Sequence, residues 1–148
     1  MTKDPAALFD VFNEIGIIDQ LTTARLEAQL PAGMIAAHFA VINHLIRVGE
    51  GTTPQRMARA FQIPKTSLTH TLQVLEKRGL IEMRPNPDDG RSKTVWLTPA
   101  GRALRGETIG KLVAASSELF EQFDVARLIE IKPVLEDLRK FLDKARDS

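Results

Sequence analysis

Residues 64–98 have the sequence PKTSLTHTLQVLEKRGLIEMRPNPDDGRSKTVWLT, and the spacing of their apolar side chains changes partway along. From 64 to 78, leucines recur every three or four residues, which is the period of one helix face. Residues 80–84 and 94–97 alternate apolar and polar side chains, as half-buried strands do. Residues 85–91 between them are rich in Pro, Asp and Gly, which favour turns. The stretch therefore predicts a helix followed by a β-hairpin with a long exposed loop.

The predicted helix has two faces of opposite character. One face holds three leucines, Leu68, Leu72 and Leu75. The other carries short hydrogen-bonding side chains, whereas a merely solvated face would favour Glu and Lys. Such side chains can reach base edges in a DNA major groove, which is about 12 Å wide. The residues expected to do so are Thr66, Ser67, Thr69, His70 and Gln73. Lys65, at the helix start, is expected to bind a phosphate. The alternative is an ordinary surface helix, because amphipathicity alone is common to all of them.

Further helices are expected on both sides of this stretch. Asp4-Pro5, Thr53-Pro54 and Thr98-Pro99 each place a capping side chain before a proline, which favours a helix start. Helices are predicted over 4–30, 33–48, 53–61, 98–120 and 124–145. Pro133 should kink or split the last of them. Two short helices followed by a hairpin is the order of a winged helix-turn-helix. The predicted fold is thus mostly α with a small β-hairpin wing and additional helices at both ends.

Length and composition narrow the class of protein. A chain of 148 residues predicts one compact domain with extra helices. The absence of Cys excludes disulfides, thiolate nucleophiles and Cys-ligated zinc. No apolar run is long enough for a membrane span, and the N-terminus has no apolar signal core. We therefore expect a cytoplasmic protein that does not contact a membrane.

The net charge of +1 conceals an uneven distribution. Residues 54–105 hold ten Lys or Arg and four Asp or Glu, a net charge of +6. The other residues hold ten basic and fifteen acidic side chains, a net charge of −5. A basic middle between acidic ends indicates an anionic partner for the middle segment, such as double-stranded DNA. The alternative is a basic face that is merely solvated.

The hairpin loop supplies a second set of expected DNA contacts. Arg91 follows Gly90 at the loop tip and is suited to a narrow minor groove, where negative potential attracts guanidinium groups. Arg84 and Lys93, on the two strands, are expected near the flanking phosphates. Asp88 or Asp89 could pair with Arg91 and hold its side chain in place. The alternative is a solvated loop with one local ion pair of little energetic value.

These segments together resemble the DNA-binding domain of the MarR family of bacterial transcriptional regulators. The likeness covers residues 53–104 and is strongest in the wing, where Asp89 and Arg91 stand two apart and Leu97-Thr98 follows. The other matching stretches are Lys65-Thr66-Ser67-Leu68-Thr69-His70, Leu75-Glu76-Lys77-Arg78-Gly79-Leu80-Ile81 and Pro85-Asn86-Pro87-Asp88-Asp89-Gly90-Arg91. Helices before and after this core extend the resemblance over nearly the whole chain.

The resemblance implies a homodimer that binds a palindromic operator. Residues 1–32 and 106–148 would form the helical dimerisation region, and residues 33–105 the winged DNA-binding domain. Half-sites should then lie about one helical turn apart. The resemblance also implies a regulator, here expected to be a repressor, that a small aromatic or phenolic anion releases from DNA. The residues expected to line the pocket for that ligand are Phe12, Ile15, Met34, His38 and Phe39. The alternative is that these five are core and interface residues.

Two features depart from the family pattern. His70 stands where members commonly have Arg, so guanine recognition there is in doubt and a pH-sensitive contact becomes possible. Pro133 interrupts the last helix and so bears on dimer packing. The absence of Cys also removes the peroxide-sensing thiol found in some relatives.

The sequence contains no recognisable catalytic or metal-binding motif. Residues 106–111 resemble a phosphate-binding loop, but they are one spacer short and Leu112 replaces the Ser or Thr that would bind magnesium. His38 and His44 are six residues apart and cannot chelate one metal from a single helix face. No cofactor, metal or enzymatic activity is expected. The alternatives are a winged-helix module that binds only proteins, which the basic segment disfavours, and a small enzyme without a known motif.

Overall fold

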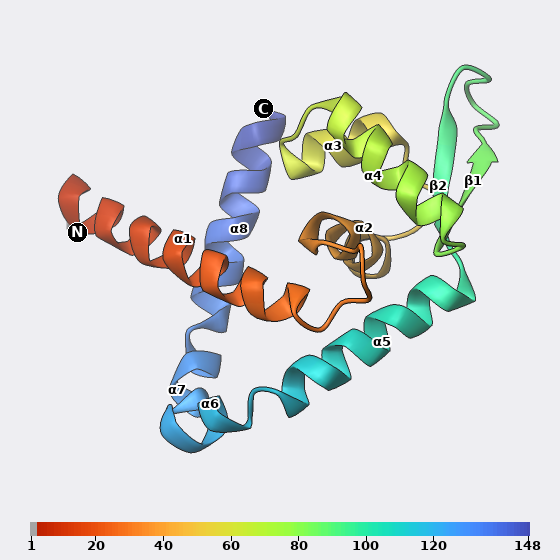
Figure 1. The fold of residues 1–148 in the computed structure, drawn as a ribbon. Helices are drawn as coiled ribbons and strands as arrows, with labels where there is room; N and C mark the ends of the chain where they lie inside the picture. The colour runs from red at the N-terminus through yellow and green to blue at the C-terminus, as the bar shows by residue number, and fades with distance from the viewer. Residues whose placement is uncertain (1–2) are drawn as a thin grey trace.

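The computed structural model describes residues 3–148 as a mostly helical chain with one two-stranded antiparallel hairpin (Figure 1). In chain order the elements are α1 (Pro5–Glu27), α2 (Ala36–Arg47), α3 (Pro54–Phe61), α4 (Lys65–Lys77), β1 (Ile81–Pro85), β2 (Lys93–Leu97), α5 (Pro99–Ala114), α6 (Ser117–Gln122), α7 (Val125–Glu130) and α8 (Lys132–Asp147). The predicted fold class is confirmed. Within the described residues, no helix combines the length and apolarity needed to cross a lipid bilayer.

Three helices begin at the predicted cap-plus-proline pairs. The Asp4 carboxylate accepts from two main-chain N–H groups of α1, at 3.0 and 3.2 Å. The Thr53 hydroxyl accepts from a main-chain N–H of α3 at 3.3 Å. The Thr98 hydroxyl accepts from the Gly101 N–H at 3.1 Å and donates to the Gly79 carbonyl at 2.7 Å. Thr98 therefore caps α5 and also ties it to the end of the α4–β1 turn.

The connection between α1 and α2 is longer than predicted. Helix α1 ends at Glu27, before the predicted Leu30, and α2 begins at Ala36 instead of Gly33. Gly33 has a φ of 81°, in the left-handed region that favours glycine and interrupts a helix. The Glu27 carboxylate accepts the Ala36 N–H at 2.8 Å, so the end of α1 caps the start of α2.

The predicted helix over 98–120 is broken into two. Helix α5 ends at Ala114 and α6 begins at Ser117. The Ser116 hydroxyl donates to the Leu112 carbonyl at 2.6 Å, an arrangement that competes with helical main-chain bonding. Pro133 splits the last predicted helix, which is one of the two outcomes expected for it. It lies in the first turn of α8, where its missing N–H is tolerated.

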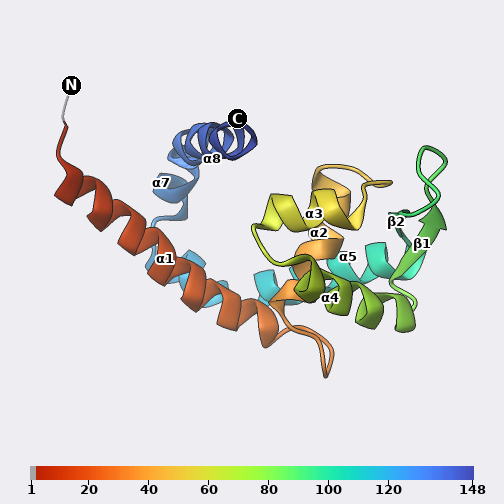
Figure 2. The same ribbon diagram turned by 90° about the horizontal axis from the view of Figure 1, so that it is seen from above.

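One hydrophobic core lies between α2, α3, α4, the hairpin and the start of α5 (Figure 2). Its fully buried apolar side chains are Val41, Ile42, Leu45, Met57, Leu68, Leu75 and Val95. Each contributes about 1.5–3 kcal/mol by leaving water. Because the leucines of α4 face this core, the polar side of α4 faces outward.

The base of the hairpin is fixed to the rest of the core. Met83 on β1 lies opposite Val95 on β2, which is fully buried. Val95 also exchanges two main-chain hydrogen bonds with the α2–α3 loop, its N–H donating to the Thr52 carbonyl at 2.9 Å. The Glu50 carboxylate accepts the Leu97 N–H at 2.8 Å. The strands are thus held at the end nearest α5, and the loop beyond them projects outward (Figure 1).

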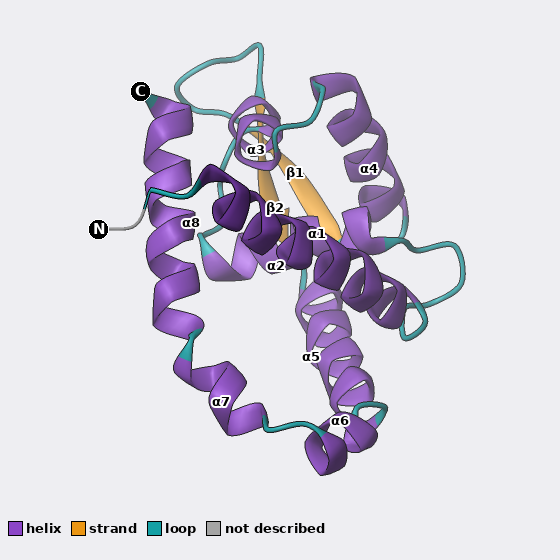
Figure 3. Ribbon diagram, turned by 90° about the vertical axis from the view of Figure 1, so that its left-hand side faces the viewer, coloured by secondary structure: helices purple, strands orange, loops and turns teal. Residues whose placement is uncertain are grey.

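The terminal helices leave much apolar surface exposed. Helix α1 buries none of its residues, and neither do α6, α7 and α8. Their exposed large apolar side chains include Leu8, Phe9, Val11, Phe12, Ile15, Ile18, Leu21, Leu128, Ile129, Ile131, Val134, Leu135, Phe141 and Leu142. Helices α5 to α8 form an arc that brings the end of α8 back to α3 (Figures 1 and 3). There the Arg146 guanidinium donates to the Ala60 carbonyl at 3.2 Å.

Candidate nucleic-acid interface

Helix α4 presents its polar residues to solvent as predicted. Leu68, Leu72 and Leu75 are buried, and Thr71 joins them, with its hydroxyl bonded to the main chain. The exposed side chains include Thr66, Ser67, Thr69, His70 and Gln73. Helix α3 precedes α4 across a three-residue connection in which Gln62 adopts a φ of 55°. Helices α3 and α4 form a helix-turn-helix with a hydrogen-bonding outer face.

A groove of about 360 Å³ lies between the start of α4 and the hairpin loop. It brings together five of the ten expected DNA-contacting residues, namely Lys65, Thr69, Asp89, Arg91 and Lys93. The three cationic side chains of this set are exposed and form no ion pair with any residue in 3–148. Three cations against the single carboxylate of Asp89 give the groove an excess of positive charge, which favours a polyanion.

The wing loop is ordered by its own side chains. The Asn86 side chain accepts the Asp88 N–H at 3.0 Å and donates to the Ser92 hydroxyl at 2.9 Å. The Asp89 carboxylate accepts the Arg91 main-chain N–H at 2.9 Å. The expected side-chain pairing of an aspartate with Arg91 is wrong within residues 3–148, because neither Asp88 nor Asp89 forms an ion pair with the Arg91 guanidinium and Asp89 bonds the main chain of the turn instead. This leaves the Arg91 guanidinium free of an internal partner within the described chain.

Arg84 lies away from the groove. Alternation along β1 places it on the face opposite Met83, where its guanidinium pairs with Glu82 at 3.1 Å. It also lies over the Trp96 ring, 4.3 Å from the centroid, in a cation–π contact. The indole N–H of Trp96 donates to the Thr94 hydroxyl at 2.8 Å. Arg84 is thus part of a stacked cluster on the outer side of the wing.

Six groove residues were absent from the sequence-based set, namely Thr53, Pro54, Gln55, Met83, Asn86 and Ser92. Thr53 and Gln55 contribute from the start of α3, and Asn86 from the wing. The Thr53-Pro54 helix start was visible in the sequence and placed Gln55 in the first turn. Its position beside the wing depends on the packing of α3 against β2, which local patterns do not encode.

The residues expected to bind an effector lie in two different environments. Met34 and His38 are buried in the core, and Phe39 is half-buried. The His38 Nδ1 atom accepts the Ile35 N–H at 2.9 Å. Phe12 and Ile15 are exposed on the first half of α1, which extends away from α2 (Figures 1 and 2).

The two buried histidines should make stability depend on pH. Burial lowers the pKa of His38 below its ordinary value of 6.5, and the charges of Arg78 and His70 lower it further. Burial and Arg47 likewise lower the pKa of His44. The unfolded chain therefore binds more protons than the folded chain below pH 6.5, so full stability is present above that pH and is lost as the pH falls.

Thermal unfolding at pH 7.5 and 5.5 measures this effect. We expect a lower Tm at pH 5.5, with about 2–4 °C lost per kcal/mol in a chain of this size. His38→Asn keeps an acceptor for the Ile35 N–H but does not titrate, so it should reduce the pH dependence. His70→Asn removes an exposed histidine whose charge is only the last of the three causes that lower the pKa of His38, so it should reduce the pH dependence less than His38→Asn does. An unchanged pH profile in His38→Asn would show that the buried imidazole is not responsible.

The helix-turn-helix, its outward polar face and the adjacent basic wing define a winged helix-turn-helix protein of the DNA-binding class. Residues 32–92 match the family model described as MarR family. Transcriptional regulator HosA of Escherichia coli O111:H- is 29% identical over 122 residues, covering 75% of this chain and 89% of HosA. The multiple antibiotic resistance protein MarR of Escherichia coli K12 is 32% identical over 103 residues, covering 64% of this chain and 71% of MarR. The chain belongs to the MarR family of transcriptional regulators, which are not enzymes.

Solved structures share the whole fold. The crystal structure of a MarR family transcription regulator aligns with a TM-score of 0.71 and 27% identity, covering 97% of this chain and 95% of that one. A mutant MarR from Escherichia coli, complexed with operator DNA, aligns with a TM-score of 0.68 and 24% identity, covering 92% and 99%. The terminal helices are thus part of the shared architecture as well as the winged core.

Proposed function

We propose that the protein is a homodimeric repressor that binds a palindromic operator in the cytoplasm. In each half-site α4 enters the major groove and the tip of the wing enters the minor groove. The observation that carries the proposal is the row of Lys65, Arg91 and Lys93, free of internal ion pairs, beside the polar face of α4. The likeness to a mutant MarR that is complexed with operator DNA supports DNA as the partner.

Different contacts would serve different purposes on the DNA. Thr66, Ser67, Thr69, His70 and Gln73 face base edges and determine the preferred sequence. Phosphates are bound by Lys65 and Lys93 in the groove, and by Arg84 from the outer side of the wing. Asp89 acts indirectly, because it holds the turn that presents Arg91.

The proposed dimer assigns separate roles to the ends and the middle of the chain. Residues 1–32 and 106–148 form the dimerisation region, and residues 33–105 form the DNA-binding domain. Burial supports this division, because α1, α6, α7 and α8 contribute no buried residue. The apolar side chains that these helices expose would be covered by the same helices of a second copy.

We also propose that a small aromatic or phenolic anion releases the protein from DNA. Phe12 and Ile15 lie on the exposed α1, whereas Met34, His38 and Phe39 lie at the start of α2. A pocket formed by all five would need the partner's helices to enclose its α1 side. The site would therefore be completed by dimerisation.

Selection of DNA fragments from a random pool by the purified protein tests the function. The expected result is an enriched palindrome whose half-sites are centred about one helical turn apart. Enrichment of a single, unrepeated half-site would contradict the dimer while retaining DNA binding. Failure to enrich any sequence would contradict the proposed function.

Arg91→Ala should weaken binding to the selected operator by about 1–3 kcal/mol, or roughly 5- to 150-fold in Kd. The reason is that the Arg91 guanidinium forms no ion pair within residues 3–148, so the substitution removes a DNA contact without breaking an internal one. Fluorescence anisotropy with labelled operator measures the change, and Arg127→Ala, on α7, is the control for loss of one positive charge. Wild-type affinity in Arg91→Ala would show that the wing tip does not bind DNA. Substitutions of Thr69 and His70 should change sequence preference more than affinity.

A further inference from the structure

Trp96 lies on the outer face of the hairpin, opposite the face that lines the groove beside α4. It is the only tryptophan of the chain, and it is half-buried. Alternation along the strands places four side chains on this outer face. They are Glu82 and Arg84 on β1, and Thr94 and Trp96 on β2. Trp96 is therefore a large aromatic ring among polar neighbours.

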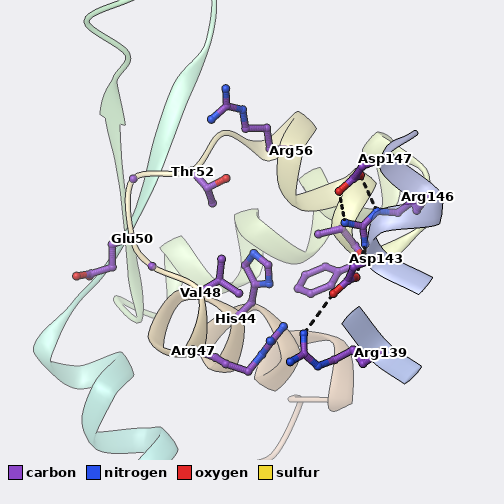
Figure 4. A pocket seen from close by; sticks show the side chains of 14 residues that line it. His44, Arg47, Val48, Glu50, Thr52, Arg56, Arg139, Asp143, Arg146 and Asp147 are labelled. Atoms are coloured by element: carbon purple, nitrogen blue, oxygen red, sulfur yellow. Dashed lines mark hydrogen bonds and ion pairs between the residues drawn. The ribbon is translucent and has the colours of Figure 1, made fainter. Parts of the chain in front are cut away.

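One edge of the Trp96 ring lies against the loop that joins α2 to α3. Glu50 and Thr52 of this loop lie beside the strands, and the loop also lines a cavity (Figure 4). Gly51, between them, has a φ of 87°, and a Cβ on it would lie 3.1 Å from a ring carbon of Trp96. The Gly51 N–H donates to the Val95 carbonyl at 2.8 Å, which holds the loop beside β2. The ring thus packs directly on the main chain of the loop.

The face of the ring is covered by Arg84. The centre of the guanidinium lies 4.3 Å from the ring centroid, where the negative face of the indole attracts it. Two nitrogens of the same guanidinium donate to the Glu82 carboxylate, at 3.1 and 3.4 Å. The indole N–H donates to the Thr94 hydroxyl at 2.8 Å, and that hydroxyl donates to the Arg84 carbonyl at 3.3 Å. Both the side chain and the main chain of Arg84 are therefore linked to Trp96.

The position of Arg84 connects this stack to the tip of the wing. Strand β1 ends at Pro85, one residue after Arg84, and the loop that carries Arg91 follows. A hairpin of two strands varies more in twist than a wider sheet does. The buried Val95 holds the inner face of the hairpin at its base, and the ring of Trp96 holds the outer face between the α2–α3 loop and Arg84. Contacts on both faces restrict the twist of the strands.

We propose that Trp96 is a positioning residue for DNA binding. By packing on Gly51 and under Arg84, it sets the twist of the strands and so the direction in which the loop leaves them. That direction presents Arg91 to the minor groove. Trp96 acts through Arg91 and requires no DNA contact of its own. The inference rests on the proposed function, because it requires Arg91 to bind the operator.

A double-mutant cycle between Trp96→Leu and Arg91→Ala tests the coupling. Fluorescence anisotropy gives the Kd for the selected operator in the wild type, both single variants and the double variant, at a temperature at which circular dichroism shows them folded. In the wild type, Arg91→Ala should raise the Kd roughly 5- to 150-fold. We expect Trp96→Leu to raise it about tenfold, and Arg91→Ala to add no more than about threefold in that background, because coupled residues are not additive.

Trp96→Phe is the matched control, because it keeps a ring between Gly51 and Arg84 and loses the indole N–H. It should bind the operator like the wild type. A purely structural role would lower the Tm of Trp96→Leu but leave the effect of Arg91→Ala unchanged. If Trp96→Leu does not fold, Arg84→Lys takes its place in the cycle. Lysine keeps the positive charge at this exposed position but lacks the flat guanidinium that the ring and Glu82 hold.

The outcomes separate this inference from the proposed function. An Arg91→Ala effect of wild-type size in the Trp96→Leu or Arg84→Lys background would overturn the positioning role and leave DNA binding through Arg91 intact. An equal loss of affinity in Trp96→Phe and Trp96→Leu would overturn the role of the stacked ring. Wild-type affinity in Arg91→Ala would overturn both the inference and the proposed wing contact.

Discussion

Raising the salt concentration from about 50 to 200 mM should weaken operator binding about 10⁴-fold. This is the largest effect expected for the protein. Each phosphate that a Lys or Arg neutralises releases condensed counterions, and the slope of log K against log salt is about −0.9 per phosphate. Lys65, Arg84, Arg91 and Lys93 would bring about eight positive charges of a dimer close to the DNA phosphates, counting Arg91 in the minor groove between them, and hence the slope should be near −7. The basic groove predicts this salt dependence because its three cations form no ion pair within residues 3–148 and are therefore available to bind phosphates.

Anisotropy titrations at several potassium chloride concentrations measure the slope. Lys93→Gln removes one contact from each protomer and should reduce the slope by about two, with similar weakening for every DNA sequence. Lys111→Gln, on α5 outside the groove, removes the same charge and should leave the slope unchanged. Affinity that did not respond to salt in this range would contradict binding through phosphates.

Gly101→Ala should destabilise the folded chain by about 3 kcal/mol, the upper part of the range for overpacking a core. An added Cβ would meet the Leu80 carbonyl oxygen and would lie 2.8 Å from a methyl group of Leu97. The carbonyl cannot move freely, because it accepts the Thr98 N–H at 3.2 Å. The better helix propensity of Ala, about 1 kcal/mol, offsets only part of the cost.

Thermal unfolding at pH 7.5 measures the change, which corresponds to a fall in Tm of about 6–12 °C. Gly90→Ala is the matched control, because a Cβ there meets nothing within 4 Å. It should leave Tm within the error of the measurement. A Gly101→Ala variant as stable as wild type would show that α5 can shift away from the hairpin without cost.

The elements that the sequence predicts most closely are those with local signals. Helix α3 ends at Phe61, as predicted, and begins at Pro54, one residue after its Thr53 cap. The signal for this start is local, because the capping residue and the proline are adjacent in the sequence. The exposed face of α4 follows from leucine spacing alone. The break at Ser116 was missed, because a serine hydroxyl can face solvent or bond the helix backbone and composition does not distinguish the two.

The side-chain arrangements that were missed depend on pairs far apart in the chain. The stacking of Arg84 on Trp96 requires the register of β1 against β2, which the loop residues alone do not determine. The placement of Arg47 and Arg139 around one cavity requires the arc of helices that returns α8 to α3 (Figure 3). Such contacts follow from tertiary packing, so periodicity and motif spacing cannot supply them.

The attachment of the hairpin at one end has a mechanical consequence. Val95 and Leu97 are held by the α2–α3 loop, whereas the hydrogen bonds given for residues 86–92 all lie within the hairpin loop itself. The wing is thus fixed to the core at its base, near α5, and is not attached to the core at its tip. The tip can therefore move to follow a wider or narrower minor groove without breaking a core contact. We expect variation in operator shape to reduce affinity less where the wing binds than where α4 binds.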